Sequence, residues 1–324
     1  MTNHWVFLVI IVNSPMTKNK VPSTKYQVQT TMTILLLLFL FIYSVGNSQG
    51  LPDTEIFLAN LTIEEGDVTI GKPMNITNRE GYDNQPSFSP DGRSIYFTSI
   101  RDTIQADTYR HDIEEDSTVR VTSTEESEYS PTVMFDERFF SVVRVEKDST
   151  QRLWKFNLDG TNPELVLKGI KPVGYHCWLD SFWVALFVLG EPNLLLLTDI
   201  RNEKPVTIAN NIGRSLHVVP GENAMSYVAK ENDSTWLIRT FNFDLKRTAT
   251  IAQTLQGSED FVWLPNRTLL MAKGSTIYKF NPESDATWVE IADVSGDGIT
   301  SITRLAVNRE ATRLAIVGIK EKKE

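Results

Sequence analysis

The chain has 324 residues, of which 41% are apolar, 10% aromatic and 23% charged, so it can bury a full hydrophobic core and is not expected to be disordered. Its formal net charge is −9, and Lys and Arg form no basic stripe along the sequence. A nucleic-acid-binding protein needs clustered Lys and Arg to neutralise phosphates, so we expect no nucleic acid partner.

Residues 1–48 are interpreted as a signal peptide or leader that is not part of the fold. They contain three lysines and no acidic residue, and residues 34–43 form an unbroken apolar run followed by small residues. This order is typical of a secretory signal with cleavage after Gly46 or Ser48, and the run is too short for a bilayer, which needs about 20 apolar residues. We expect a periplasmic or secreted protein without a stable membrane span after cleavage. A later translation start and an uncleaved anchor are the alternatives.

Residues 84–113 contain the clearest structural signal. The Ser-Pro-Asp-Gly turn at residues 89–92 combines a proline that presets φ, an aspartate that can bond to the local backbone and a glycine that tolerates positive φ. A β-branched and aromatic run at residues 95–97 follows it, so we predict a hairpin. Residues 108–113 are predicted to add a third strand.

Weaker copies of this hairpin recur along the chain. Each copy has an apolar anchor residue at the position of Phe88, followed by a polar turn and a second apolar run. The spacings between anchors are 45, 45, 40, 45 and 44 residues. The anchors are Phe88, Val133, Trp178, Val218, Trp263 and Val307.

A second recurring element lies between the anchors. Its copies occupy residues 55–61, 107–113, 152–159, 193–200, 236–244 and 276–281. Four-stranded units of about 40 to 45 residues are the signature of a β-propeller. Because the chain begins with the second element and ends with the first, one unit must be split between its ends. We therefore predict an all-β fold in which residues 49–324 form a single six-bladed β-propeller. Its last blade is closed by N-terminal strands from residues 55–77 and C-terminal strands from residues 304–318.

The Ser-Pro-Asp-Gly turn, its flanking strands and the period of about 44 residues resemble the WD40-like (PD40) repeats of the TolB family. The match is close in residues 85–113 and weaker in later copies, none of which keeps the whole turn. The resemblance implies a periplasmic or extracytoplasmic propeller used for binding. TolB itself carries a further N-terminal α/β domain, for which we expect no counterpart in this chain.

No catalytic set emerges from the remaining residues. The single cysteine, Cys177, is interpreted as a buried thiol, and the acidic stretch 125–128 as a solvated loop between blades. His176 and His217 precede their anchors in adjacent blades, near the predicted channel. Some propeller lyases hold a metal there with several histidines, but with no third ligand in view we predict no metal and no cofactor.

The predicted ligand site follows from propeller geometry. In each repeat, the residue three positions before the anchor should lie at one mouth of the central channel, where mixed polar groups around an opening suit a ligand or peptide. These positions are Gln85, Ser130, Tyr175, Ser215, Asp260 and Arg304. His176 and His217 join them, and Asp83, Glu128 and Glu259 would extend the rim. The alternative is that these groups only hydrate the channel.

These observations favour an exported, non-catalytic propeller that acts as a monomer and binds a protein or peptide of the cell envelope at its central channel. The alternative is a propeller lyase or hydrolase that acts on a polysaccharide or peptide. It would need a third metal ligand or a carboxylate pair at the channel. A propeller that serves a separate catalytic domain is a third possibility. The binding role rests on the family resemblance and on the absence of a recognisable catalytic set.

Overall fold

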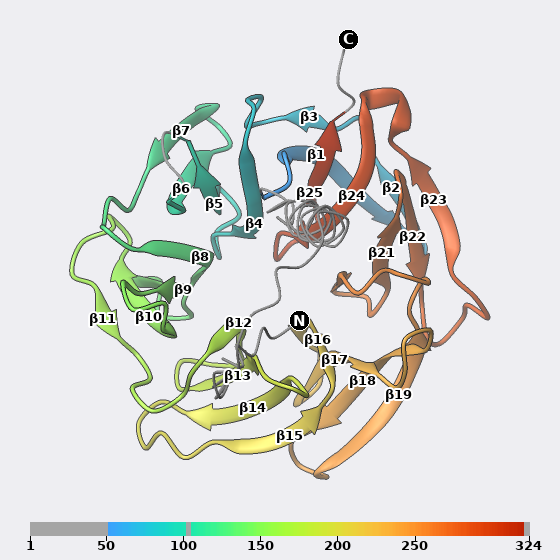
Figure 1. The fold of residues 1–324 in the computed structure, drawn as a ribbon. Helices are drawn as coiled ribbons and strands as arrows, with labels where there is room; N and C mark the ends of the chain where they lie inside the picture. The colour runs from blue at the N-terminus through green and yellow to red at the C-terminus, as the bar shows by residue number, and fades with distance from the viewer. Residues whose placement is uncertain (1–50, 102–104, 321–324) are drawn as a thin grey trace, which may run out of the picture. The chain divides into compact units, whose positions relative to one another are not determined.

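The fold is described here from a computed structural model, which covers residues 51–101 and 105–320. These residues form six antiparallel sheets arranged around a common centre, as Figure 1 shows. Each sheet is one blade, and its first strand along the repeat lies innermost. The all-β fold and the six blades predicted from the repeat are therefore confirmed.

The blades are numbered here from the Ser-Pro-Asp-Gly repeat onward. Blade 1 consists of β4 (Tyr82–Phe88), β5 (Ser94–Ile100), β6 (Asp107–Asp112) and β7 (Ser117–Arg120). Blade 2 consists of β8 (Ser127–Val133), β9 (Phe139–Val145), β10 (Gln151–Asn157) and β11 (Glu164–Leu165). Blade 3 consists of β12 (Val173–Trp178), β13 (Trp183–Val188), β14 (Leu194–Asp199) and β15 (Val206–Asn210).

The second half of the ring repeats this order. Blade 4 consists of β16 (Ile212–Val218), β17 (Ala224–Lys230), β18 (Trp236–Asn242) and β19 (Arg247–Gln253). Blade 5 consists of β20 (Phe261–Trp263), β21 (Leu269–Lys273), β22 (Thr276–Phe280) and β23 (Val289–Asp293). Blade 6 consists of β24 (Ile299–Val307), β25 (Arg313–Lys320), β1 (Glu55–Glu64) and β2 (Asp67–Ile70), with β3 (Met74–Asn75) paired to β1. A 3₁₀ turn, η1 (Ser295–Asp297), precedes β24.

The anchors of the repeat mark one structural position. Every one of them is the last residue of an innermost strand, immediately before the turn to the second strand. In the best-preserved turn, Gly92 has φ +69° and Asp91 accepts a hydrogen bond from the backbone N–H of Arg93 at 3.1 Å. The anchors differ in burial: the Trp178 and Trp263 residues are buried, whereas the Val218 residue is 38% exposed. The spacing of the anchors therefore marks where each innermost strand ends, and it does not mark a position that is always buried.

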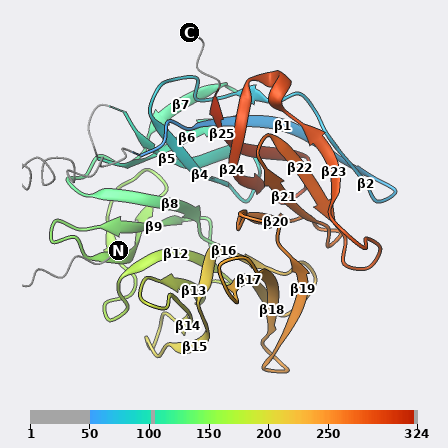
Figure 2. The ribbon, with the colours of Figure 1, turned by 45° about the vertical axis from the view of Figure 1, so that its right-hand side comes forward.

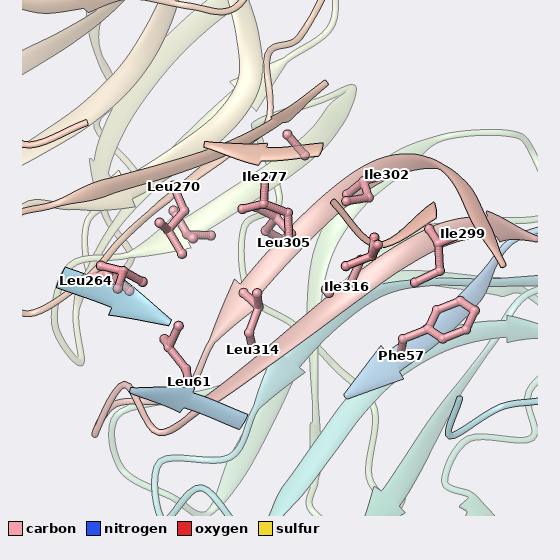
Figure 3. Close-up of a cluster of buried hydrophobic side chains, with 14 of the residues drawn as sticks. Phe57, Leu61, Leu264, Leu270, Ile277, Ile299, Ile302, Leu305, Leu314 and Ile316 are labelled. Atoms are coloured by element: carbon pink, nitrogen blue, oxygen red, sulfur yellow. The ribbon is translucent and has the colours of Figure 1, made fainter. Parts of the chain in front are cut away.

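Blade 6 is closed by strands from both ends of the propeller. Antiparallel pairing runs from Glu55 opposite Gly318 to Asn60 opposite Arg313. This pairing covers the edges that β1 and β25 would otherwise expose. Figure 3 shows the apolar side chains packed between blades 5 and 6 at this closure, where Leu264 and Leu270 face Leu305 and Leu314.

Six apolar clusters form among the described residues, one between each pair of neighbouring blades. The blades are packed face to face around the ring, which Figure 2 shows in an oblique view. Buried strand runs such as Ile95 to Phe97 and Val184 to Leu186 supply these contacts. The sheets are covered on both faces, which is why their sequences contain short continuous apolar runs.

The acidic stretch 125–128 was interpreted from the sequence as a solvated loop, and the structure supports this only in part. Glu125 is exposed and pairs with Lys147, as expected of a solvated loop. Glu128, however, lies in β8 with no exposed surface, where it accepts hydrogen bonds from Thr122 at 3.1 Å and Thr124 at 2.5 Å. The interpretation as a solvated loop is wrong for Glu128, because the strand begins inside the acidic run and points this side chain into the contact between blades 1 and 2.

The predicted leader, residues 1–48, lies outside the described residues. Within the part of the chain that the structure describes, no helix is long and apolar enough to cross a membrane.

Candidate functional site

The innermost strands are irregular close to the predicted rim positions. Their pairing with the second strand shifts register beside Gln85 in blade 1, Ser130 in blade 2, Tyr175 in blade 3, Ser215 in blade 4 and Arg304 in blade 6. Such β-bulges re-aim a side chain and interrupt the ladder. In these five blades the bulges therefore affect which residue faces the central axis, whereas the pairing in blade 5 is regular.

Electrostatic interactions and close contacts link one residue from each of the six blades. Because these contacts join blades on opposite sides of the ring, we call this set the axial cluster: Tyr82, Tyr129, Tyr175, Arg214, Asp260 and Arg304. The three tyrosines come from the innermost strands of blades 1 to 3. The arginines come from blades 4 and 6, and Asp260 directly precedes the innermost strand of blade 5.

Two arginines extend across the channel. The guanidinium of Arg304, in blade 6, lies 5.3 Å from the ring centroid of Tyr175, in the opposite blade 3. Arg214, in blade 4, donates a hydrogen bond to the backbone carbonyl of Thr303, in blade 6, at 3.2 Å. Both contacts skip at least one intervening blade. The arginines therefore cross the channel at this level instead of lying along its wall.

The charges at this level are unevenly paired. Asp260 Oδ2 lies 3.7 Å from Arg214 Nε and 3.9 Å from Arg304 Nη1, both beyond hydrogen-bonding distance. Its Oδ1 instead accepts a hydrogen bond from the backbone N–H of Leu305 at 3.2 Å. The neighbouring Glu259 lies 2.8 Å from Lys230 and 3.7 Å from Arg214. Three cations thus share two carboxylates.

Burial and the neighbouring charges shift the pKa values of Asp260 and Tyr82. Burial raises the pKa of Asp260 above its ordinary value, although Arg304 and Arg214 act to lower it. Burial raises the pKa of Tyr82 to about 12, against the lowering effect of Arg304 and Arg214, so its hydroxyl stays protonated at neutral pH. Tyr175 and Tyr129 raise that pKa further, which places the three phenols within electrostatic range of one another.

Gln85 and Ser130 are used in a contact between blades 1 and 2. The Gln85 side-chain carbonyl accepts hydrogen bonds from the backbone N–H of Ser130 and from the Thr98 hydroxyl, both at 2.8 Å. Ser215 makes a similar link to blade 5, where the backbone N–H of Phe261 donates to its hydroxyl at 3.3 Å. The structure brings three of the predicted rim positions, Tyr175, Asp260 and Arg304, to the centre and uses the other three between blades.

The two histidines make separate serine contacts. His176 Nε2 lies 2.7 Å from the Ser141 hydroxyl, which also accepts a hydrogen bond from the indole N–H of Trp178. His217 Nε2 lies 3.0 Å from the Ser215 hydroxyl. Burial lowers both pKa values to about 4, so both rings are neutral at pH 7. Among residues 51–101 and 105–320, no group of three or more His, Cys, Asp or Glu could hold a metal ion.

Asp83 and Glu128, which were predicted to extend the rim, make buried polar contacts instead. Asp83 is fully buried and accepts hydrogen bonds from Ser99 at 2.5 Å and Arg79 at 2.9 Å. Cys177 is a free thiol, and burial raises its pKa to about 12, so it is not a reactive thiolate at neutral pH.

Tyr82, Tyr129 and Arg214 were missed because a fixed offset from the anchor ignores the bulges. They lie six, four and four residues before their anchors, whereas Tyr175, Asp260 and Arg304 lie three before theirs. One available signal was the recurrence of Tyr or Arg three to six residues before five of the six anchors.

A separate pocket of about 550 Å³ lies between blades 3 and 4. Asn210 of β15 lines one side, and Tyr227, Lys230 and Arg239 of blade 4 line the other. Arg239 is paired with Glu231 at 2.9 Å and Lys230 with Glu259, so the charges that line the pocket already have partners. We therefore place the candidate site at the axial cluster.

Solved structures show the same fold at low sequence identity. A protein assigned as TolB from Agrobacterium tumefaciens superposes with a TM-score of 0.66 at 11% identity, and the match covers 83% of this chain and 99% of that one. TolB from Acinetobacter baumannii gives a TM-score of 0.55 at 11% identity, covering 94% of this chain and 72% of that one. An oligogalacturonate lyase in complex with manganese gives 0.52 at 12% identity, covering 81% and 83%.

These likenesses define the class of fold: the chain is a TolB-like six-bladed β-propeller. No protein-family model matches the sequence, and no curated protein matches it. Because the same fold appears in a lyase, the likeness alone does not separate binding from catalysis.

Proposed function

We propose that this protein is an exported, monomeric propeller without catalytic activity, which binds a protein or peptide partner of the cell envelope at its central channel. The observation that carries the proposal is the convergence of one polar or aromatic side chain from every blade on the channel axis. Tyrosine and arginine are among the residue types enriched where proteins bind proteins, because they combine a large contact area with hydrogen-bond donors. The leader pattern of residues 1–48 supports export.

Site-specific photo-crosslinking tests this proposal. The amino acid benzoylphenylalanine would replace Tyr129, at the axial cluster, and, as a matched control, Val119 on the outer strand β7, which is 46% exposed. After irradiation in cells, we expect a discrete adduct with one partner protein from position 129 and none from position 119.

The double variant Asp260→Ala/Arg304→Ala should abolish that adduct while circular dichroism shows an intact fold. Equal adducts from positions 129 and 119, or no adduct from position 129, would count against binding at the channel.

A carbohydrate or peptide lyase or hydrolase is the second candidate. Two carboxylates, those of Glu259 and Asp260, each lie 3.7 Å from Arg214 Nε. One solved structure of similar fold is an oligogalacturonate lyase. An enzyme of this kind could use one carboxyl group as an acid and the other as a base. It should cleave oligogalacturonate or peptide substrates, with turnover lost in Glu259→Gln and Asp260→Asn. Absence of cleavage by the intact wild-type protein would remove this candidate.

A further inference from the structure

Two side chains of the axial cluster reach across the ring at one level. Arg304 of blade 6 extends to Tyr175 of blade 3, and Arg214 of blade 4 extends to the Thr303 carbonyl of blade 6. A peptide that enters from the mouth where the innermost strands begin would meet these side chains end-on. A segment that continues in both directions would have to displace both arginines. The arrangement therefore favours a chain end over an internal segment.

The charge at this level selects which chain end. Arg214, Arg304 and Lys230 carry three positive charges against the two carboxylates of Glu259 and Asp260. This local excess of positive charge lies inside a protein whose formal net charge is −9. A protonated amino terminus would be repelled by such a site, whereas a carboxylate would be attracted.

Hydrogen-bond donors are also available there. Arg304 Nε is buried and has no hydrogen-bond partner, and the same is true of Arg214 Nε. A buried guanidinium without full pairing is costly, and a carboxylate is the group that a guanidinium binds best, through two parallel hydrogen bonds. Tyr82 keeps its phenolic proton at neutral pH and can add a third donor.

We propose that the axial cluster binds the C-terminal carboxylate of a partner peptide, with Arg304 and Arg214 as the principal donors and the tyrosines of blades 1 to 3 in contact with the last side chains. This inference rests on the proposed function and specifies the chemistry of its ligand. It assigns the site a chain-terminal carboxylate instead of an internal acidic residue.

Paired peptide libraries test the assignment. Random hexapeptides with free C-terminal carboxylates, and the same library with C-terminal amides, would be presented to the full-length protein, and dissociation constants of enriched sequences would be measured. We expect amidation to weaken binding at least about tenfold, which corresponds to the loss of about 1.4 kcal/mol of charge-assisted hydrogen bonding. Arg304→Gln should produce a comparable loss for the free acids and little further loss for the amides.

Arg313→Gln provides the matched control. Arg313 lies on β25 outside the cluster, where it donates a hydrogen bond to Asn60 at 2.6 Å, and its replacement should leave binding of the free acids unchanged. The assignment would be overturned if C-terminally amidated peptides bound as tightly as the same peptides with a free carboxylate. This holds for peptides without acidic side chains and for peptides that contain an internal Asp or Glu. If the crosslink at position 129 forms in that case, partner binding at the channel stands and only the terminal carboxylate is rejected.

Discussion

The contact between blades 5 and 6 and the contact between blades 1 and 2 are built from different chemistry. Among the described residues, the first contains fifteen buried apolar side chains and includes the closure of the ring. The second contains four buried apolar residues, Tyr96, Phe140, Val142 and Phe156. The same contact holds the buried carboxyl group of Glu128, whose Oε1 lies 3.4 Å from Arg144 Nε.

The difference separates two ways of joining blades. Apolar packing gains free energy in proportion to the area that it buries, and it is insensitive to pH. A buried carboxyl group is costly to ionise, so its contribution to stability depends on its protonation state and therefore on pH. We therefore expect the closing contact to determine much of the stability of the ring and the contact between blades 1 and 2 to determine its pH dependence.

The largest expected effect is at the closing contact. Phe57 on β1 is 3% exposed and packs in the cluster of Figure 3. Phe57→Ala should lower the free energy of unfolding by about 3 to 5 kcal/mol, measured by urea denaturation, because it leaves a cavity where the terminal strands meet. Phe135→Ala is the control, since Phe135 is 56% exposed and its loss should change stability by less than about 0.5 kcal/mol. Similar losses in both variants would show that the closure is not a stability determinant.

The next effect is a dependence on pH at the contact between blades 1 and 2. Burial raises the pKa of Glu128 from 4.5 to about 7, with Thr124, Arg144 and Thr122 acting against the rise. Between pH 4.5 and 7 the folded protein therefore binds the proton more tightly than the unfolded chain. Stability from this group is fully present below pH 4.5 and is lost as the pH rises toward 7, by on the order of 3 kcal/mol.

Urea denaturation from pH 4.5 to 8 would measure this loss. Glu128→Gln should flatten the pH profile, because the variant has no group that titrates at this position. Glu125→Gln, three residues away and exposed, should keep the wild-type profile. A Glu128→Gln profile parallel to that of the wild type would mean that Arg144 keeps Glu128 charged throughout the range and would contradict the raised pKa.

The smallest effect concerns the turn that first revealed the repeat. Gly92 has φ +69°, and a Cβ atom there would lie 3.2 Å from Glu310 Oε2 of blade 6. Gly221 occupies the corresponding turn of blade 4 at φ +74°, with open space around it. Both alanine variants should lose about 1 to 2 kcal/mol through the left-handed backbone, and Gly92→Ala should lose slightly more because Glu310 must move. Thermal denaturation of the two variants measures the difference, and a greater loss for Gly221→Ala would contradict the contact with blade 6.

The repeat could be predicted from the sequence because turns and strand ends are local. The anchors from Phe88 to Val307 recur wherever an innermost strand stops, and polar turn residues after each anchor make this visible without knowledge of any contact. The number of blades followed from counting the repeats. The closure followed because the unit split between residues 55–77 and 304–318 can cover its strand edges only by pairing with itself.

The site depended on tertiary structure. The bulges beside Gln85, Ser130 and Ser215 shift the register in blades 1, 2 and 4, so a constant offset from the anchor missed Tyr82, Tyr129 and Arg214 there. The same offset found Tyr175, Asp260 and Arg304 in the other three blades. Period-2 alternation reverses with each one-residue shift, so the residue that faces the axis depends on pairing and not on spacing.

The burial of Glu128 was decided in the same way. Its sequence neighbours Glu125 and Glu126 indicate a solvated surface, yet Glu128 is buried because the strand and the adjacent blade enclose it. Local sequence thus determined where strands begin, turn and repeat. Only the packing of one blade against the next decided which polar side chains reach the axis and which are buried between sheets, because those positions depend on contacts between residues distant in the chain.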